Sequence, residues 1–417
     1  MAARGADLAA YRRARREFYA RFPRFWPDTP AGEEYALYGV HPLAASEQRE
    51  IRAAAAALWH LYARVAPLLR ALPDEALLSM GLPPAALAVA RVSVPDMAET
   101  VIGRFDLAPT PDGYKMLELN ADTPTFLVEC FHLNGAACAA FDAPDPNAGQ
   151  EARLAAALTR ACRAALRQVG REGGPAYVAW ASFGEHHEDR ETTRYLMRLA
   201  RLPERVRRRY VAIESLQIDG GGLYDGAGRR IHVLFRLYPL EFFADDKDPA
   251  TGTPIGEMLF RLVEQNQLAL INPPSAFLLQ SKAVQAVLWG LAEGGGYFDA
   301  AERALIRRHL LPTYLDPVFD GPHVIKPVFG REGDTVAIVG REQVHASEAQ
   351  SFTDQPMVYQ QYVPMPEAEL MTAQGMQRLS LLTTCFVIGG EPSAVGLRAG
   401  GLITDDRCRF VPVGGFT

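Results

Sequence analysis

Apolar residues recur every three or four positions over several long stretches, a spacing typical of helices with one buried face. The longest, "SEQREIRAAAAALWHLYARVAPLLRAL" at residues 46–72, predicts a helix with Ser46 as its N-cap. Further helices are expected at residues 150–170 and 188–200. Residues 1–95 as a whole are expected to be largely helical.

Alternating or continuous apolar runs predict strands between these helices. The runs at residues 100–109 and 113–122 flank the turn "TPDG" and predict a β-hairpin. "AYVAWAS" at residues 176–182 is typical of a buried strand. Two more strands, at residues 207–217 and 229–243, are expected around the glycine-rich turn "DGGGLYDGAG".

The C-terminal part of the chain is expected to be rich in antiparallel strands. "HVIKPVFGREGDTVAIVG" at residues 323–340 predicts a strand, a glycine-containing loop and a second strand. The segments at residues 356–366 and 379–401 continue this pattern. Helical segments are expected before it, between the strand at residues 229–243 and residue 296. The order of elements indicates an α+β fold, with mixed and antiparallel sheets flanked by helices.

Composition and charge narrow the class of protein. The chain has 417 residues, 48% of them hydrophobic, and a net charge of -6, so neither a small domain nor a nucleic-acid partner is expected. No apolar run reaches the roughly 18 residues of a membrane span, and no signal-peptide core is present. Five cysteines without a CxxC pair favour a reduced, cytoplasmic protein. The arginine-rich "YRRARREFYARF" is expected to be a solvated helix face.

Lysine is scarce in this sequence. Of 43 basic residues only four are lysines: Lys115, Lys247, Lys282 and Lys326. Where arginine is the general choice, a retained lysine can mark a position that needs a compact point charge, as between phosphate oxygens. Chance is the alternative explanation.

The predicted hairpin concentrates polar side chains. Alternate residues of a strand share a face, so Arg104 lies beside Asp106, and Glu118 beside Asn120. If the strands pair through the "TPDG" turn, all four side chains converge. Two carboxylates and an amide oxygen suit Mg²⁺, and the arginine suits a phosphate group. A surface hairpin with a salt bridge is the alternative.

Two lysines stand at positions suited to phosphate binding. Lys326 ends an apolar strand before a loop with Gly330 and Gly333, whose backbone N–H groups can approach phosphate oxygens. An exposed lysine near a hairpin turn is the alternative. Lys282 opens the helix "SKAVQAVLWGL". "VYQQYV" could offer backbone groups to an adenine ring, although an ordinary strand explains it equally well.

Taken together and in this order, the segments "GRFD", "LELNADTPT", "LYPLEFF", "SKA", "VIKPVFGREG", "YQQYV" and "GLRAGGLITDD" resemble the synthetase part of the glutathionylspermidine synthetase family, over roughly residues 95–413. The resemblance implies an ATP-grasp fold in circularly permuted chain order, with ATP and Mg²⁺ as cofactors. It also implies a division into a helical region at residues 1–95 and a synthetase region at residues 96–417. Within the latter it implies a metal-binding segment (100–130), a substrate lobe (about 150–270) and a nucleotide-binding lobe (about 275–417).

The resemblance also implies roles for individual residues. Catalytic roles fall on Arg104 and Arg398, and the Mg²⁺ ligands would be Asp106, Glu118 and Asn120. The residues implied to bind ATP are Lys282, Lys326, Gly330, Arg331, Glu332, Gly333, Gln360, Gln361 and Tyr362. Thr123 and Thr125 would lie near the acyl substrate.

Three departures from the family pattern bear on the substrates. The stretch "NPPSAFLLQSK" has Asn272 and Ser275 in place of acidic and aromatic residues, "PLEFF" replaces "PLEW", and no histidine follows "RFVP". As mapped on the sequence, all three lie away from the metal and phosphate residues. Because only 103 residues precede Arg104, no added amidase domain is expected.

The expected function is an ATP-dependent ligase that joins a small-molecule or peptide carboxylate to an amine, such as a polyamine or amino acid, and releases ADP and phosphate. A non-catalytic ATP-binding regulator and a phosphotransferase are the alternatives. A cationic amine would be held by acidic residues: Glu188, Asp189, Glu241 and Asp405. For the first two, a favourable charge at a helix start is the competing interpretation.

Overall fold

The computed structural model describes residues 8–340 and 343–416, and all statements below concern these residues. The helices are α1 (Leu8–Tyr19), α2 (Ala45–Arg70), α3 (Asp74–Ser79), α4 (Asn134–Ala140), α5 (Gln150–Gln168), α6 (His187–Leu199), α7 (Leu240–Asp245), α8 (Ile255–Glu264), α9 (Ala276–Gln280), α10 (Ala283–Gly294) and α11 (Ala300–His309). The strands are β1 (His41–Ala44), β2 (Ile102–Thr110), β3 (Gly113–Asn120), β4 (Ala176–Ser182), β5 (Val206–Ala212), β6 (Gln217–Asp219), β7 (Gly222–Tyr224), β8 (Arg230–Ile231), β9 (Val233–Arg236), β10 (Ala269–Ile271), β11 (Thr313–Tyr314), β12 (His323–Pro327), β13 (Ala337–Val339), β14 (Val344–Ala346), β15 (Met357–Gln361), β16 (Glu367–Thr372), β17 (Gly375–Ile388), β18 (Glu391–Gly400), β19 (Arg409–Val411) and β20 (Val413–Phe416).

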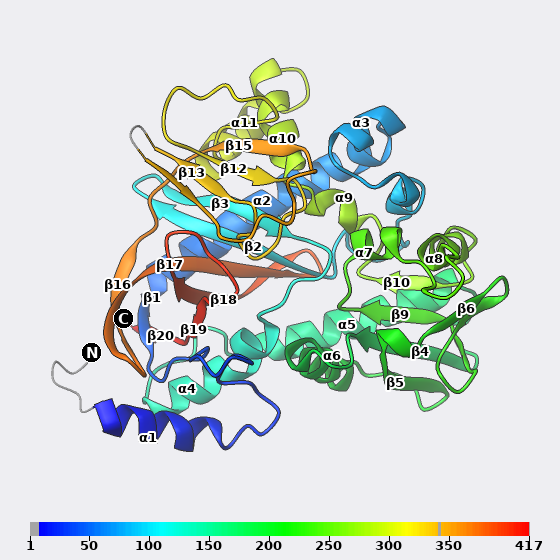
Figure 1. Ribbon diagram of the computed structural model, residues 1–417, viewed down its shortest axis with the longest axis horizontal. Helices are drawn as coiled ribbons and strands as arrows, with labels where there is room; N and C mark the ends of the chain where they lie inside the picture. The colour runs from blue at the N-terminus through cyan, green and yellow to red at the C-terminus, as the bar shows by residue number, and fades with distance from the viewer. Residues whose placement is uncertain (1–7, 341–342, 417) are drawn as a thin grey trace.

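The central sheet contains the predicted hairpin. Its strands follow the order β19-β18-β17-β2-β3, with β16 also paired to β17, and all pairs are antiparallel. The long helix α2 packs against β3, β17 and β18 and covers one face, as Figure 1 shows. The opposite face is therefore available for polar side chains.

A second antiparallel sheet, in the order β11-β15-β12-β13-β14, brings together the strand that carries Lys326 and the strand considered for an adenine ring. Lys326 lies on β12, and its partner strand β15 carries Gln360 and Gln361. In Figure 1 this sheet lies above the central sheet.

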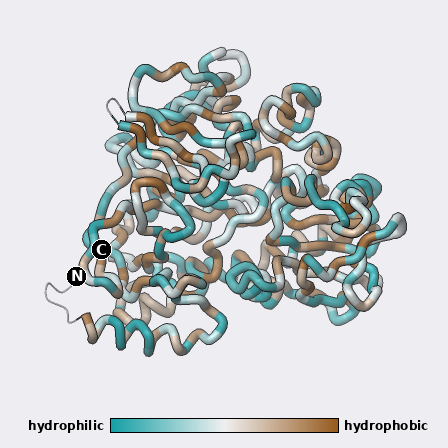
Figure 2. Tube along the Cα trace, viewed as in Figure 1, coloured by the Kyte–Doolittle hydropathy of each residue, from teal (hydrophilic) through white to brown (hydrophobic). Residues whose placement is uncertain are grey.

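A parallel sheet in the order β10-β9-β4-β5 forms a separate layer of the molecule. Every residue of β4 is buried, as expected for a strand covered on both faces. Helix α5 packs on β9 and β10, and α6 packs on β4 and β5. Figure 2 shows hydrophobic segments along these strands and hydrophilic residues on the outer turns.

Most predicted elements are present, but several details differ: the strand predicted at residues 207–217 ends at Ala212, and the predicted turn after it contains β7. Helix α2 begins one residue before Ser46, and Ala44, which has no side-chain hydrogen bond, takes the N-cap position. The N-terminal region is less helical than expected, because residues 20–40 form a loop and β1 follows it. The predicted strand at 229–243 ends at Arg236 and gives way to α7, and β10 was not predicted.

Two coarse properties of the chain follow from the same structure. All five cysteines are buried and free of disulfide bonds. Among the helices described, none is both long enough and apolar enough to cross a membrane.

Candidate active site

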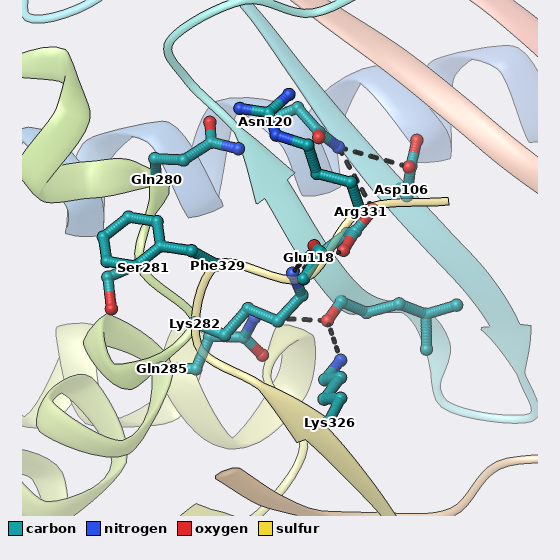
Figure 3. Close-up of polar contacts among 12 residues, drawn as sticks. Asp106, Glu118, Asn120, Gln280, Ser281, Lys282, Gln285, Lys326, Phe329 and Arg331 are labelled. Carbon is teal, nitrogen blue, oxygen red and sulfur yellow. Dashed lines mark hydrogen bonds and ion pairs between the residues drawn. The ribbon is translucent and has the colours of Figure 1, made fainter. Parts of the chain in front are cut away.

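The β2–β3 hairpin brings four polar side chains to one face of the central sheet. Arg104 is paired with Asn120, and Asp106 with Glu118, in the strand register. Asn120 Nδ2 lies 3.2 Å from Glu118 Oε1 and 3.4 Å from Asp106 Oδ2 (Figure 3). Phe105 points to the other face, where α2 lies. The alternation of polar and apolar residues in the sequence therefore places the polar side chains on one face of the sheet and the apolar ones on the other, as expected.

Asp106 is the most heavily engaged carboxylate in this group. Arg104 donates to both of its oxygens, at 3.0 and 2.9 Å, and Arg398 of β18 donates to Oδ2 at 2.8 Å. Thr384 of β17 donates to Oδ1 at 2.8 Å. Three neighbouring strands thus fix one buried anion between two guanidinium groups.

The two lysines singled out by their scarcity lie on either side of Glu118. Lys282, which precedes α10, has its Nζ 3.3 Å from Glu118 Oε2. Lys326 of β12 donates to the main-chain oxygen of Leu117 at 2.7 Å and to Gln360 Oε1 at 2.8 Å. Figure 3 shows both ammonium groups directed toward the end of the hairpin. Gln360 is accordingly occupied in positioning Lys326.

The clustered charges shift the pKa values of these groups. Burial disfavours ionisation of Glu118, but the positive charges of Lys282, Lys326 and Arg104 outweigh it and hold the pKa of this carboxyl well below its usual range. Burial lowers the pKa of Lys326 to about 7, against the attraction of Glu118. This end of the site is therefore short of negative charge and suited to an anionic ligand.

The glycine-containing loop lies beside Lys282, whose Nζ donates to the main-chain oxygen of Gly330 at 2.8 Å. Arg331 forms an ion pair with Glu241 of α7 at 2.6 Å, so the loop is connected to the layer that contains the parallel sheet. Gly333 has a φ of +71°, where a side chain would be strained. The loop thus has a defined conformation at the edge of the site.

A cavity of about 480 Å³ joins these groups. Of the predicted site residues, only Asp189 and Glu241 do not line it. Asp189 instead holds His186 at 3.0 Å, and Glu241 holds Arg331; both partners line the cavity. The predicted residues that line it are Arg104, Asp106, Glu118, Asn120, Thr123, Thr125, Glu188, Lys282, Lys326, Gly330, Arg331, Glu332, Gly333, Gln360, Gln361, Tyr362, Arg398 and Asp405.

The end of the cavity beside α6 is acidic. Burial and the charge of Glu129 raise the pKa of Glu188 to about 7, and burial also raises the pKa of Glu332. Glu129 is itself buried: Tyr35 donates to its Oε1 at 2.7 Å, and its Oε2 has no hydrogen-bond partner among the described residues. Burial accordingly raises the pKa of Glu129. The cavity thus has cationic and acidic ends.

A model of the family described as "Glutathionylspermidine synthase preATP-grasp" matches residues 13–414. The chain belongs to this family. Membership confirms the resemblance noted in the sequence and places the protein among ATP-grasp-type ligases of the glutathionylspermidine synthetase kind.

Solved structures bear on the fold of this family member. It is similar to a glutathione synthetase-like effector from Globodera pallida in its apo form, with a TM-score of 0.59 and 12% identity over 98% of this chain and 97% of that one. This similarity and the family match confirm the predicted α+β, ATP-grasp fold. A putative gamma-glutamylcysteine synthetase from Methylobacillus flagellatus KT matches over 85% of each chain at 10% identity and a TM-score of 0.42.

One departure from the family pattern, Asn272, lies next to the site rather than away from it. Its Oδ1 accepts hydrogen bonds from the main-chain N–H groups of Val101 and Ile102, at 2.9 and 3.0 Å. Its Nδ2 donates to the carbonyl oxygens of Ala121 and Asp122, at 3.0 and 2.7 Å. The amide therefore ties the start of β2 to the segment after β3, which is a structural role that the sequence comparison missed.

The residues expected to bind Mg²⁺ offer oxygen atoms, which are the ligands that a hard cation prefers. The structure's described residues contain no cluster of three His, Cys, Asp or Glu side chains suited to a metal. The hairpin offers two carboxylates and an amide instead, which are oxygen donors. Glu118 is the most available of them, because its side chain is 30% exposed and its Oε2 is shared only with Lys282. Asp106, by contrast, is held by two arginines.

Sequence reasoning missed several residues that shape the site. Glu129 and Tyr35 were not predicted, because a single glutamate in an apolar helix and a tyrosine in a loop belong to no regular pattern of residues. Gln280 accepts from the main-chain N–H groups of residues 121 and 122, and Gln285 contacts Gln360 at 2.5 Å. An amide in the otherwise apolar segments "AFLLQ" and "AVQAVLW" was the available sign.

Proposed function

We propose that this protein is an ATP-dependent ligase that joins a carboxylate to an amine through an acyl phosphate. Family membership supports the general chemistry. The observation that carries the finer proposal is the division of one cavity into a cationic end, with Lys282 and Lys326, and an acidic end, with Glu188. A carboxylate–amine ligase needs both, because one substrate carries phosphates and the other carries an ammonium group.

In the first step, Lys282 and Lys326 would hold the phosphates of ATP, while Arg104 and Arg398 face the transferred group. An oxygen of the substrate carboxylate attacks the γ-phosphorus; the new P–O bond forms as the bond to ADP breaks. The two guanidinium groups offset the charge on the phosphoryl oxygens, which is the largest contribution to this kind of catalysis. Mg²⁺ held by Glu118, Asn120 and Asp106 would supply further charge neutralisation.

In the second step, the amine would approach from the α6 end. Glu188 has no hydrogen-bond or ion-pair partner among the described residues, so its carboxylate is available to an ammonium group. After the ammonium loses a proton to water, the nitrogen lone pair attacks the acyl carbon, and the attached nitrogen then gives a second proton to the departing phosphate. The C–N bond forms and the bond to phosphate breaks, with the electron pair leaving on phosphate. Thr123 and Thr125 line the cavity between the two ends.

Protection of the acyl phosphate from water would fall to the loop at residues 330–333. Arg331 connects this loop to Glu241 at 2.6 Å and lies 3.5 Å from Thr123. The loop thus borders the cavity where the acyl group would lie. Exclusion of water by such a loop favours aminolysis over hydrolysis.

Two other functions remain as alternatives. A non-catalytic nucleotide-binding regulator would need the lysines but not the arginine pair on Asp106. A phosphotransferase would need the cationic end but not the acidic one. The present arrangement retains both features, which favours a ligase.

The deciding experiment is product analysis with a panel of amino acids and polyamines as amine donors. The proposal predicts ADP and phosphate in equal amounts with the amide product. Formation of AMP would indicate adenylation, phosphorylated substrate without amide would indicate a phosphotransferase, and nucleotide binding without turnover would indicate a regulator.

A further inference from the structure

A second cavity, of about 470 Å³, lies between the segment that follows α1 and helix α6. It shares no lining residue with the main cavity. Its size falls within the range of roughly 300–1,000 Å³ that is usual for small-molecule sites. Nothing in the proposed ligase chemistry uses it.

The walls of this cavity are largely aromatic and apolar. Phe22 and Tyr195 flank His132, each with ring centroids 6.0 Å from the histidine ring. Phe25 and Trp26 contribute a second pair of rings, 5.0 Å apart. Such walls suit an apolar or aromatic body.

The acidic residues of the lining are already engaged by the protein. Tyr195 donates to Glu151 at 2.7 Å, and His132 lies 3.6 Å from the same carboxylate. Glu191 is buried and forms an ion pair with Arg194 at 2.8 Å. Neither carboxylate therefore presents a free charge to a ligand.

Three exposed arginines line the cavity: Arg21, whose guanidinium group lies over neighbouring phenylalanine rings, Arg24 and Arg198. Arg24 and Arg198 form no ion pair and no hydrogen bond with the described residues. Arg24 and Arg198 line the same cavity, and burial together with the positive charge of Arg24 lowers the pKa of Arg198. The indole Nε1 of Trp26, a residue 7% exposed, also lacks a partner in the part of the chain that the structure describes. Three exposed guanidinium groups thus border an aromatic cavity, and none of them has an ion-pair partner among the described residues.

We propose that the second cavity is a binding site for a small amphipathic organic anion. Its apolar or aromatic body would fill the cavity, and its carboxylate, sulfonate or phosphate group would lie between Arg24 and Arg198. An anion there removes the repulsion between the two guanidinium groups and gains charge-assisted hydrogen bonds. Cations would be repelled, and neutral aromatic compounds would gain only the apolar contacts.

The test uses two matched fluorescent probes: anilinonaphthalene sulfonate, which is an aromatic anion, and N-phenylnaphthylamine, which lacks the sulfonate. Arg24→Gln combined with Arg198→Gln should weaken the anionic probe at least about tenfold, as expected for lost charge-assisted contacts, and leave the neutral probe within twofold. Arg205→Gln, which changes an exposed arginine outside the cavity, is the control and should change neither. Unchanged binding of the anionic probe in the double variant would overturn the proposal, as would equal loss of both probes.

A second measurement locates the probe. Energy transfer to the bound anionic probe should fall more in Trp26→Phe than in the matched variant Trp59→Phe, because Trp26 lines the cavity and Trp59 lies in α2. Transfer that survives Trp26→Phe unchanged would place the probe elsewhere and refute the assignment. Since no ATP or amine is present, failure here would leave the ligase proposal untouched.

Discussion

The ion pair of Asp122 and Arg236 gives the sharpest test of how the site is held together. Both side chains are fully buried, and the guanidinium nitrogens of Arg236 lie 2.6 and 2.9 Å from the two carboxylate oxygens. Asp122 also accepts the main-chain N–H of Leu240 at 3.1 Å. The pair thus joins the segment after β3, which leads into Thr123, to strand β9 and the start of α7.

Removing one member leaves the other as an uncompensated buried charge. Asp122→Leu or Arg236→Met alone should therefore lower the free energy of unfolding by about 3–5 kcal/mol. That is a large part of the roughly 5–15 kcal/mol of a typical domain. The double variant removes both charges and replaces them with apolar side chains of similar size, so it should cost less than either single variant.

Urea unfolding followed by circular dichroism measures these differences, provided that all variants share one slope against denaturant. The reasoning fails if Asp122→Leu costs less than about 1 kcal/mol, because a fully buried arginine would then tolerate the loss of its partner. It also fails if the costs of the two single changes simply add in the double variant, because contacting residues should show coupling.

Three further predictions concern the proposed activity. Glu118→Gln should lower kcat roughly 100-fold or more, and it should also lower the melting temperature, because it removes the negative charge that Lys282 and Lys326 face; near-normal kcat would exclude Glu118 as a metal ligand. Lys282→Ala and Lys326→Ala should each weaken ATP binding about tenfold, measured by calorimetry, and unchanged affinity in both would remove them from the nucleotide site. Because the pKa of Glu188 is raised to about 7, its carboxylate gains a proton as pH falls below 7, so KM for the amine should rise up to about tenfold per pH unit there; Glu188→Gln should have a flat profile, and a wild-type profile flat between pH 6 and 8 would contradict the role.

The local parts of this site were predictable from sequence because they depend on spacing. The hairpin needs only an alternating pattern and a turn, and these put Asp106 and Glu118 on one face. The scarcity of lysine drew attention to four positions, and two of them, Lys282 and Lys326, line the cavity. These signals act over a few residues or over composition as a whole.

The remaining features depend on contacts between distant segments. Asn272 and Gln280 form hydrogen bonds with main-chain groups more than 150 residues away in the sequence. The residues around Asn272 and Gln280 contain no pattern that predicts these partners. The β9–α7 segment was predicted as one strand because apolar and aromatic residues predominate in it. The structure ends the strand at Arg236, where the buried pair with Asp122 and the hydrogen bond from Leu240 begin the helix. Tertiary contacts therefore determined where the strand ends and the helix begins, which the local sequence did not specify.

The distribution of charge within the main cavity distinguishes the chemistries that remain. Transfer of phosphate to a hydroxyl group would require the cations around Asp106 and Glu118. It gains nothing from burying Glu188 near Glu129, where burial and the charge of Glu129 raise the pKa of Glu188 and so disfavour its charged form. A cationic substrate offsets that cost, because its ammonium group restores the charged form of Glu188. The strain is thus relieved only when an amine is bound, and this argues that the acidic end exists for a cationic acceptor. An acceptor panel should therefore rank amines by the positive charge near the reacting nitrogen, and a preference for neutral nucleophiles would show that the acidic end has another purpose.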